Sequence, residues 1–221
     1  MPSPDHSYVP PANTPLTILY IDQGLLAVDK PAGLLSVPGR GPDKADCLLA
    51  RLQQDYPEAL VVHRLDMETS GIVLFARSTD AQSQLGKLFE SRLISKRYTA
   101  LVHGELTNTE GEIDLPLIAD WPNRPRQKVD FEVGKPSQTR YRVLEYDSRS
   151  ATTRIELEPV TGRSHQLRIH MMSIGHAIVG DRLYGREQSP TTDRLLLHAN
   201  YISMKMDDTE LPVSVECPAP F

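Results

Sequence analysis

The densest group of reactive side chains in the sequence runs from His63 to Gly71 and reads HRLDMETSG. It lies between two apolar runs, so the carboxylate of Asp66 is expected at the end of a strand, beside a turn that contains glycine. A strand end is a rigid place from which a carboxylate can act as a base or a nucleophile. The alternative is structural, because an aspartate at a turn also accepts hydrogen bonds from nearby amides, here those of Thr69 and Ser70.

A second group runs from Gly162 to His170 and reads GRSHQLRIH. His165 and Arg168 are three residues apart near the start of an expected helix, so they share one of its faces. A guanidinium, an imidazole and free backbone amides on one face suit the binding of an anion or a carboxylate. An ordinary solvated basic surface explains the same pattern equally well.

The histidines and cysteines do not have the spacing of a metal site. His165 and His170 are five residues apart and His170 and His176 are six apart, whereas paired ligands on one helix face are four apart. Cys47 and Cys217 each lack a second ligand nearby in the sequence and are typical of reduced thiols in a cytoplasmic protein. We therefore predict no metal site.

Motifs of several other protein classes are missing from the sequence. No serine lies in a G-x-S-x-G elbow, and Gly39-Arg40-Gly41 is not followed by the residues of a dinucleotide or phosphate loop. No Lys or Arg precedes Lys30, which argues against a signal peptide. The longest uninterrupted apolar stretch, Ile72 to Ala76, is far shorter than the roughly 20 residues that cross a bilayer. We predict a cytoplasmic protein without membrane contact.

The elements that must position the first group alternate between strands and helices. Helical spacing of apolar residues predicts a helix over 45–56, with Asp43 or Asp46 as its N-cap. A second helix is predicted over 79–89, beginning in a capping box of Thr79 and Gln82. The expected strands of this part are Thr17–Tyr20, Leu25–Asp29, Val61–Leu65, Ile72–Arg77 and Arg97–His103.

The second half of the chain has mainly the pattern of antiparallel strands. Apolar and polar residues alternate between Gln127 and Pro159, including Val129, Phe131 and Val133, as in half-buried strands. The period then becomes helical, with Leu167, Met171 and Ile174 on one face and Gly175 as the residue after the helix. A final strand pair is expected over 195–204 and 212–217. The order of elements predicts an α+β fold with a largely antiparallel sheet.

The chain of 221 residues suits one domain, and its net charge of −5 is unevenly distributed. Residues 1–15 hold five prolines and are expected to form an irregular arm before a single domain over 16–221. Residues 1–29 and 206–221 hold seven acids and no Lys or Arg, so the middle of the chain is mildly basic. Within it, bases alternate with aromatic residues over 120–142, which is typical of a nucleic-acid surface and also of a solvated sheet face.

Four stretches together resemble the ordered motifs of the RluA-type pseudouridine synthases. They occur in the order of that family and cover the chain from about residue 18 to its C-terminus. The resemblance implies the pseudouridine-synthase fold, with a central mixed, mostly antiparallel sheet and a catalytic cleft across it. The four stretches are Lys30–Leu34, His63–Gly71, Lys96–Tyr98 and Gly162–His170.

Further stretches resemble the members of that family with dual specificity, for 23S ribosomal RNA and the tRNA anticodon stem-loop. These stretches are 34–40, 121–125 and 195–199. The family's pattern begins about 17 residues into the chain, which leaves no room for the S4 RNA-binding domain that many relatives carry. The resemblance implies structured RNA as the partner, no obligate protein partner and a monomer.

The reaction that the resemblance implies is an isomerisation of uridine. The bond from N1 of the uracil to C1′ of the ribose is cut, the uracil turns over, and C5 is joined to C1′. No redox cofactor, nucleotide or metal is needed. One carboxylate must act at the sugar, as a nucleophile at C1′ or as a base at C2′, and by motif position it is Asp66. Arg168 is implied as the guanidinium that keeps Asp66 ionised and aims it through a bidentate contact.

The target base must leave its stack before this chemistry can occur. By resemblance, Tyr98 stacks on the uracil and is a candidate to take the C5 proton, and Arg64 fills the space that the base vacates. Lys30 is expected to contact phosphate or to shape the cleft, and Leu197 and Ile169 to form apolar walls around the uracil. The remaining residues expected at the substrate are His63, Arg163 and His165.

Two other functions are compatible with the same residues. One is an RNA-binding module without catalysis, which Asp66, Tyr98 and Arg168 in their motif positions disfavour. The other is a metal-dependent hydrolase that uses the histidines, which their spacing disfavours.

Overall fold

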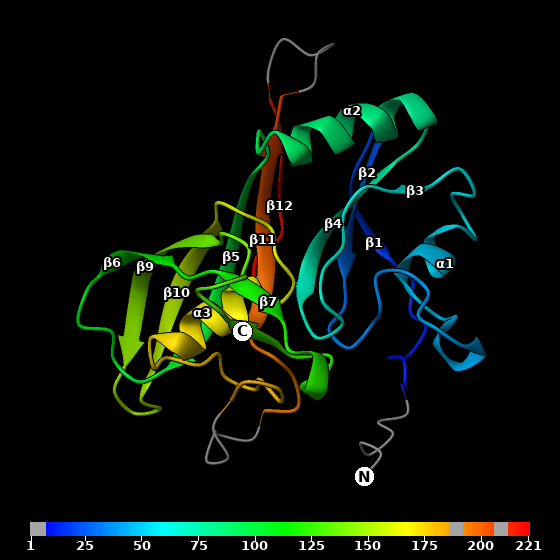
Figure 1. The fold of residues 1–221 in the computed structure, drawn as a ribbon. Helices are drawn as coiled ribbons and strands as arrows, with labels where there is room; N and C mark the ends of the chain where they lie inside the picture. Colours follow the sequence, from blue (N-terminus) through cyan, green and yellow to red (C-terminus); the bar gives the residue numbers. More distant parts are fainter. Residues whose placement is uncertain (1–7, 186–191, 206–211) are drawn as a thin grey trace.

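The computed structural model describes residues 8–185, 192–205 and 212–221, and within them a long mixed sheet organises the chain. The strands follow one another as β1-β2-β4-β11-β5-β10-β9-β6, with β3 paired to β4 and β12 paired to β11. Two short strands, β7 and β8, form a separate hairpin. Figure 1 shows β11 and β5 near the middle of the molecule, with the N-terminal elements on one side and β9, β10 and α3 on the other.

The kinds and order of the elements agree with the predicted α+β fold. The strands are β1 (Thr17–Ile21), β2 (Leu25–Lys30), β3 (Leu60–Val61), β4 (Ser70–Ala76), β5 (Ser95–His103), β6 (Glu110–Asp114), β7 (Leu117–Ala119), β8 (Gln127–Val129), β9 (Gln138–Asp147), β10 (Thr152–Pro159), β11 (Leu197–Met204) and β12 (Val213–Glu216). The helices are α1 (Leu48–Leu52), α2 (Thr79–Glu90) and α3 (Gln166–Ser173), with 3₁₀ turns η1 (Pro42–Lys44) and η2 (Trp121–Asn123).

Helices cover both faces of the N-terminal strands because β2 and β4 are apolar on both sides. One face packs against Ala81 and Leu85 of α2, and the opposite face packs against Leu48 and Leu52 of α1. In the other half, α3 buries Leu167 and Met171 against β5 and β10. The pairing of β4 with β11 is the one parallel pairing among the described strands, and it joins the two halves.

The helix starts differ from the sequence prediction by a few residues. Cys47, and neither Asp43 nor Asp46, caps α1, with its sulfur accepting a hydrogen bond from the Ala50 amide at 3.4 Å. Asp46 instead pairs with Arg51 at 2.7 Å. The cap of α2 is Ser78, whose hydroxyl accepts from the Ala81 amide, so the predicted box of Thr79 and Gln82 is wrong. A short polar side chain one position away satisfies the same free amides.

Three strand or face assignments were also wrong. The expected strand Val61–Leu65 ends at Val61, and the chain then leaves the sheet. Phe131 and Val133 lie in a turn after β8, with 77% and 67% of their surfaces exposed. Ile174 ends α3 and is 38% exposed, whereas Gly175 follows with φ 90° as predicted. Alternation over a few residues does not distinguish a strand from an extended turn.

The part of the Pro-rich arm that the structure describes lies over α1. The Tyr8 hydroxyl donates to the Asp46 carbonyl at 3.0 Å and accepts from the Leu35 amide at 3.1 Å. The Arg51 guanidinium donates to the carbonyls of Pro11 and Ala12. Residues 8–15 form no helix or strand, in agreement with the prediction, while residues 1–7 lie outside the described residues.

Candidate active site

Asp66 lies in a turn whose backbone is hydrogen-bonded to the loop of residues 30–36. The Ser36 hydroxyl donates to the Leu65 carbonyl at 2.8 Å and accepts from the Leu65 amide at 3.2 Å. The Gly33 amide donates to the Met67 carbonyl at 2.9 Å. The residues on both sides of Asp66 are therefore fixed by hydrogen bonds, while its own side chain stays 27% exposed.

Lys30 holds the same two segments together from inside. Its side chain is fully buried, and its ammonium donates to the carbonyls of Pro31, Leu34 and Met67 at 2.7–2.9 Å. Burial lowers the pKa of Lys30 to about 7, opposed by the charges of Asp66 and Glu68. All three ammonium hydrogens are used, so the expected contact with phosphate is wrong and the alternative role, shaping the cleft, fits.

Gly71 allows the turn to lie directly against β11. A Cβ atom on Gly71 would stand 2.3 Å from the Ala199 carbonyl oxygen, and its φ of 106° is one that side chains rarely adopt. Glycine is therefore required for the close parallel pairing of Ser70 and Gly71 with His198 and Ala199. This contact fixes the end of the 63–71 segment relative to the middle of the sheet.

Arg168 lies between two carboxylates. Its Nε and Nη2 donate to the two oxygens of Asp181, each at 2.8 Å, and its Nη1 lies 3.5 Å from Oδ2 of Asp66. The predicted pairing of Arg168 with Asp66 is present as an ion pair, but the bidentate partner is Asp181, so that part of the prediction was wrong. Asp181 also accepts from the amides of Leu183 and Tyr184, so its position is fixed.

His165 approaches the other oxygen of Asp66. Its Nε2 lies 3.9 Å from Oδ1, and its Nδ1 is 2.7 Å from the hydroxyl of Tyr184. Burial lowers the pKa of His165, with Arg168 acting in the same direction and Asp66 and Asp181 opposing, so the ring is neutral at pH 7. His165 and Arg168 therefore both face a carboxylate. This agrees with the interpretation of their spacing as a carboxylate-binding face, and not with that of a solvated basic surface.

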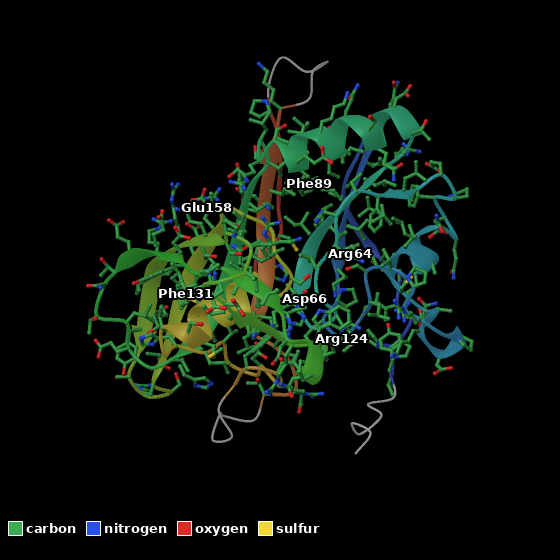
Figure 2. All side chains as sticks on the ribbon, viewed as in Figure 1. Arg64, Asp66, Phe89, Arg124, Phe131 and Glu158 are labelled. Atoms are coloured by element: carbon green, nitrogen blue, oxygen red, sulfur yellow. The ribbon has the colours of Figure 1, made fainter. Side chains whose placement is uncertain are left out.

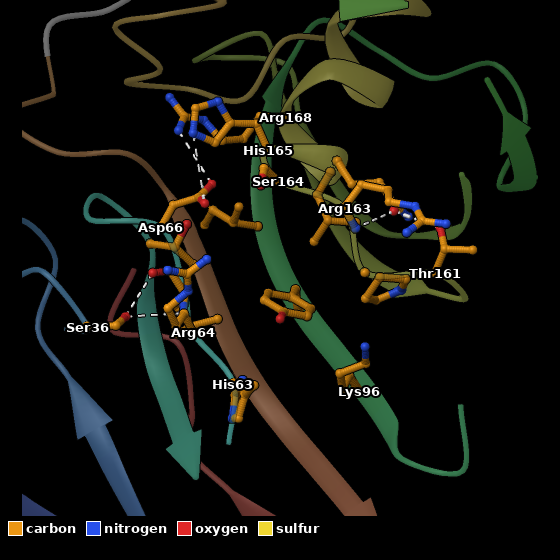
Figure 3. Close-up of a pocket in the computed structure, with 18 of the residues that line it drawn as sticks. Ser36, His63, Arg64, Asp66, Lys96, Thr161, Arg163, Ser164, His165 and Arg168 are labelled. Carbon is orange, nitrogen blue, oxygen red and sulfur yellow. Dashed lines mark hydrogen bonds and ion pairs between the residues drawn. The ribbon is translucent and has the colours of Figure 1, made fainter. Parts of the chain in front are cut away.

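A cavity of about 430 Å³ opens beside Asp66, between the two halves of the molecule. The 63–69 segment supplies one wall and the segment from β10 to α3 supplies the other, with Lys96 of β5 between them (Figure 3). Tyr98 of β5 also lines the cavity. Figure 2 shows Arg64 and Asp66 together near the centre of the molecule. The predicted site residues that line the cavity are His63, Arg64, Asp66, Tyr98, Arg163, His165, Arg168 and Leu197.

Tyr98 stands on β5, paired with Ala199 of β11 on one side and Leu157 of β10 on the other. Burial, and then the charge of Asp66, raise the pKa of Tyr98 well above its usual value. The hydroxyl is therefore a neutral phenol at pH 7. A neutral phenol is a weak base, so this environment suits stacking better than removal of a proton from C5.

His63 and Ile169 have structural contacts that the sequence did not reveal. Nε2 of His63 accepts from the Leu74 amide at 2.9 Å, and its ring lies 4.7 Å from that of Phe89. Burial lowers the pKa of His63 to about 3, so this ring is neutral. Ile169 does not line the cavity. It is fully buried with Leu117 and Tyr184, so its expected place at the uracil is wrong.

The cavity carries more cations than its carboxylate balances. Arg64, Lys96 and Arg163 line it without an ion pair within the described part of the chain, while Arg168 is neutralised by Asp181. Lys96 has one described contact, at 6.0 Å from the ring of Phe89. It was not predicted as a site residue, although it stands two residues before Tyr98 and therefore on the same face of a strand.

Three histidines of the hydrolase interpretation do not gather around one point. His170 contacts the Thr139 hydroxyl and the Leu115 carbonyl inside the core, and His176 contacts the His103 carbonyl. The described residues do contain one possible metal-ligand group, Asp29, His198 and Cys217. Both ring nitrogens of His198 are already used, by the Ser70 hydroxyl and the Cys217 carbonyl, so this group does not fit an ion.

Comparison with known proteins identifies the family. Residues 24–173 match the family model described as RNA pseudouridylate synthase, a span that includes Asp66, Tyr98 and Arg168. The chain belongs to the RNA pseudouridine synthases. It is therefore an isomerase that acts on RNA, as the resemblance in its motifs predicted.

Pseudouridine synthases with known names are similar over nearly the whole chain. The dual-specificity RNA pseudouridine synthase RluA of Escherichia coli K12 is 47% identical over 216 residues, covering 97% of this chain and 98% of that protein. RluA of Vibrio parahaemolyticus is 51% identical over 200 residues, covering 89% and 80%. The solved structure of human RNA Pseudouridylate Synthase Domain Containing 1 superposes with a TM-score of 0.81 at 29% identity, covering 96% of this chain and 87% of that one.

Helices long and apolar enough to cross a membrane are absent from the described residues of this synthase.

Besides Lys96, the sequence did not predict Asp181 and Tyr184 as site residues of this pseudouridine synthase. They lie in the stretch GDRLYG, between two glycines and outside every predicted element. One physical signal existed. Arg168 falls near the start of an expected helix, between apolar Leu167 and Ile169, and a buried guanidinium needs a carboxylate that is fixed elsewhere.

Proposed function

We propose that this pseudouridine synthase uses Asp66 as its catalytic carboxylate, on a uridine flipped into the cavity. The observation that supports the proposal is the arrangement of charge around Asp66. One of its oxygens faces Arg168 at 3.5 Å and the other faces His165 at 3.9 Å, while the side chain stays open to the cavity. The carboxylate is therefore oriented by a cation and an imidazole, and it remains available to a substrate.

Arg64 and Tyr98 have the surroundings that their proposed roles require. Arg64 is exposed at the cavity and has no ion pair within the described part of the chain, so it is free to enter a helix in place of the flipped base. Tyr98 presents a neutral ring beside Asp66, on which a uracil can stack. Leu197 supplies an apolar surface next to Tyr98.

Asp66 has two possible first steps at the sugar. As a nucleophile it attacks C1′ and displaces N1 of the uracil, and as a base it removes the proton from C2′. Deuterium at C2′ distinguishes the two routes, because only the second breaks that bond in its first step. A large isotope effect on single-turnover pseudouridine formation supports the base, and an isotope effect near one supports the nucleophile.

We propose 23S ribosomal RNA and the tRNA anticodon stem-loop as the substrates. Support comes from relatives named dual-specificity enzymes that match 89–97% of this chain at 47–51% identity. Lys96 and Arg163 in the cavity are two candidate phosphate partners, which suits recognition of a loop by its shape. We also propose that the enzyme acts as a monomer, with residues 16–221 as one catalytic domain, in the cytoplasm where both RNAs are used.

Pseudouridine mapping of total RNA tests the substrates. Cells without the gene should lack pseudouridine at specific sites in both 23S rRNA and tRNA, and the wild-type gene should restore both sets. A gene that carries Asp66→Asn should restore neither set. It is the control that separates the loss of enzymatic activity from other effects of expressing the protein. Loss of pseudouridine in only one class of RNA, or in neither, would contradict the dual specificity.

A further inference from the structure

The hydroxyl of Tyr184 lies between two nitrogen atoms. It accepts a hydrogen bond from the Gln127 amide at 2.8 Å, and it lies 2.7 Å from Nδ1 of His165. The amide can only donate, so the hydroxyl keeps its own proton for another partner. Among the described residues, Nδ1 of His165 is the hydrogen-bond acceptor within reach of that proton.

This hydrogen bond determines which nitrogen of His165 carries the ring proton. A neutral imidazole has one N–H, and a nitrogen that accepts a hydrogen bond cannot hold it. With Nδ1 accepting from Tyr184, the proton is on Nε2. Nε2 is the atom that lies 3.9 Å from Oδ1 of Asp66, so the ring presents an N–H to the carboxylate (Figure 3).

The backbone of His165 is bent into the position that makes this contact. Its φ of 55° and ψ of 16° lie in the left-handed region, which residues other than glycine seldom adopt. Such strain persists where the surroundings fix it, and here His165 stands directly before α3 with only 13% of its side chain exposed. The strained backbone of His165 therefore accompanies the contacts of its ring with Tyr184 on one side and Asp66 on the other.

We propose that Tyr184 is a positioning residue that fixes the Nε2–H tautomer of His165, so that His165 donates toward Asp66 during catalysis. Arg168 serves the other oxygen of the same carboxylate. Tyr184 does not line the cavity and so acts through His165. The inference rests on the proposed catalytic role of Asp66.

The charged groups that face His165 set the expected pH dependence. They are Asp66 across the turn, Arg168 on α3 and Asp181 before Tyr184. A hydrogen bond to the neutral form of a ring disfavours its protonation. Removal of the Tyr184 hydroxyl therefore makes Nδ1 free to take a proton, and an imidazolium beside Asp66 weakens that carboxylate as a nucleophile or base. Activity should then fall at a higher pH than in the wild type.

Tyr184→Phe tests the proposal while it keeps the ring that packs against Arg168 and Ile169. We expect kcat to fall by about tenfold to a hundredfold with KM almost unchanged, because only the orientation of catalytic groups is lost. The acid limb of the kcat profile should move to higher pH. Tyr201→Phe is the matched control, since Tyr201 lies outside the cavity, and it should keep wild-type kcat. An unchanged kcat in Tyr184→Phe would overturn the proposal.

Two further measurements separate this role from general damage to the fold. In a His165→Gln background, adding Tyr184→Phe should lower kcat by less than about twofold, because the two side chains act as one unit. An equal loss in both backgrounds would contradict the proposal. ¹⁵N NMR of the protein without RNA reports the tautomer of His165, whose ring signals are identified by their loss in His165→Gln. The wild type should show the Nε2–H tautomer, and Tyr184→Phe should show a mixture of both tautomers. An Nδ1–H tautomer in the wild type would overturn the inference about Tyr184. The proposed role of Asp66 is tested independently, by the activity of Asp66 variants.

Discussion

At the scale of single residues, Arg168 connects the carboxylate of Asp66, the proposed catalytic group, to the rest of the molecule. Its side chain is 3% exposed and that of Asp181 is 1% exposed, so both charges are removed from water at a cost of several kcal/mol each. Their bidentate contact and the two backbone amides on Asp181 offset that cost. Burial raises the pKa of Asp181, but the hydrogen bonds from Arg168 outweigh it and hold that pKa below its usual value. Arg168 is therefore a fixed cation, and Asp66 is aimed by it.

Arg168→Lys tests this division of contacts. A lysine keeps the charge but cannot hold Asp181 through two parallel bonds and reach Asp66 as well. We expect kcat to fall by about tenfold or more, with a smaller change in KM. Steady-state kinetics measure both quantities. Arg140→Lys, which affects an exposed ion pair with Glu112, is the control and should leave kcat unchanged. A variant Arg168→Lys within twofold of the wild type would refute the positioning role.

Lys96 is the residue for which a phosphate contact is the simplest function. It lines the cavity with no anionic partner among the described residues, and burial lowers its pKa. Lys96→Met should raise the Kd for RNA severalfold and make the plot of log Kd against log salt shallower by about one unit or slightly less. Lys87→Met, on the exposed face of α2, is the control. Equal salt slopes for Lys96→Met and the wild type would exclude the contact.

At the scale of elements, the 63–71 segment is built to hold still. Ser36 and Lys30 tie Leu65 and Met67, on either side of Asp66, to the 30–36 loop. The close approach of Gly71 is a second attachment, which ties the end of the segment to β11. A carboxylate between two fixed points loses little conformational freedom when it meets a substrate, which favours a high rate once the substrate is bound.

Gly71→Ala should break the second attachment. The added Cβ would meet the backbone of Ala199 at 2.3 Å, and the φ of 106° would be strained. We expect the free energy of unfolding to fall by about 2 kcal/mol or more. Urea denaturation measures it. Gly86→Ala is a matched control in α2, where an added Cβ meets nothing within 4 Å, and it should raise stability by about 0.5–1 kcal/mol. Equal stability of the two variants would contradict the close approach of β4 and β11.

The sequence predicted most elements and the main members of the site, for physical reasons that also explain the errors. Alternation of apolar and polar residues between Gln127 and Pro159 predicted half-buried strands, where the structure has β8, β9 and β10, and the helical spacing of Ala81 and Leu85 identified α2. The caps were misplaced because neighbouring polar residues can satisfy the same amides. Asp66, Tyr98 and Arg168 were found through ordered motifs. Contacts that depend on the folded path, such as Asp181 with Arg168 and the burial of Ile169 away from the cavity, leave no mark in local spacing.

At the scale of the whole molecule, the cavity exists because two halves of one sheet meet. Asp66 comes from the N-terminal half, Arg168 from α3 in the other half, and Tyr98 from β5 between them. The net charge of −5 does not describe this surface, because the cavity holds Arg64, Lys96 and Arg163 against Asp66. RNA binding by an acidic protein therefore depends on where the charges lie.

The buried histidines predict how stability depends on pH. Burial lowers the pKa values of His63, His165, His170 and His198, that of His63 to about 3. Below pH 6.5 the unfolded chain therefore binds more protons than the folded chain, so stability falls as pH falls. Between pH 7.5 and 5.0, His63 alone should reduce the free energy of unfolding by about 2 kcal/mol.

Urea denaturation at the two pH values measures this loss. His63→Gln should reduce the difference by about the same 2 kcal/mol, because the amide oxygen of glutamine lies at the position of Nε2 and can accept from the Leu74 amide without titrating. Equal stability of the wild type at pH 7.5 and pH 5.0 would mean that these rings are not held neutral in the fold.

The role of Asp66 is tested most directly by single-turnover pseudouridine formation with Asp66→Asn. Uridine labelled with tritium at C5 releases the label when C5 is joined to C1′, so the rate can be followed in an anticodon stem-loop or a 23S fragment. We predict that the variant binds these RNAs within about threefold of the wild type and releases tritium at least ~10³-fold more slowly. Release by Asp66→Asn at a rate near that of the wild type would contradict the assignment of Asp66 as the catalytic carboxylate.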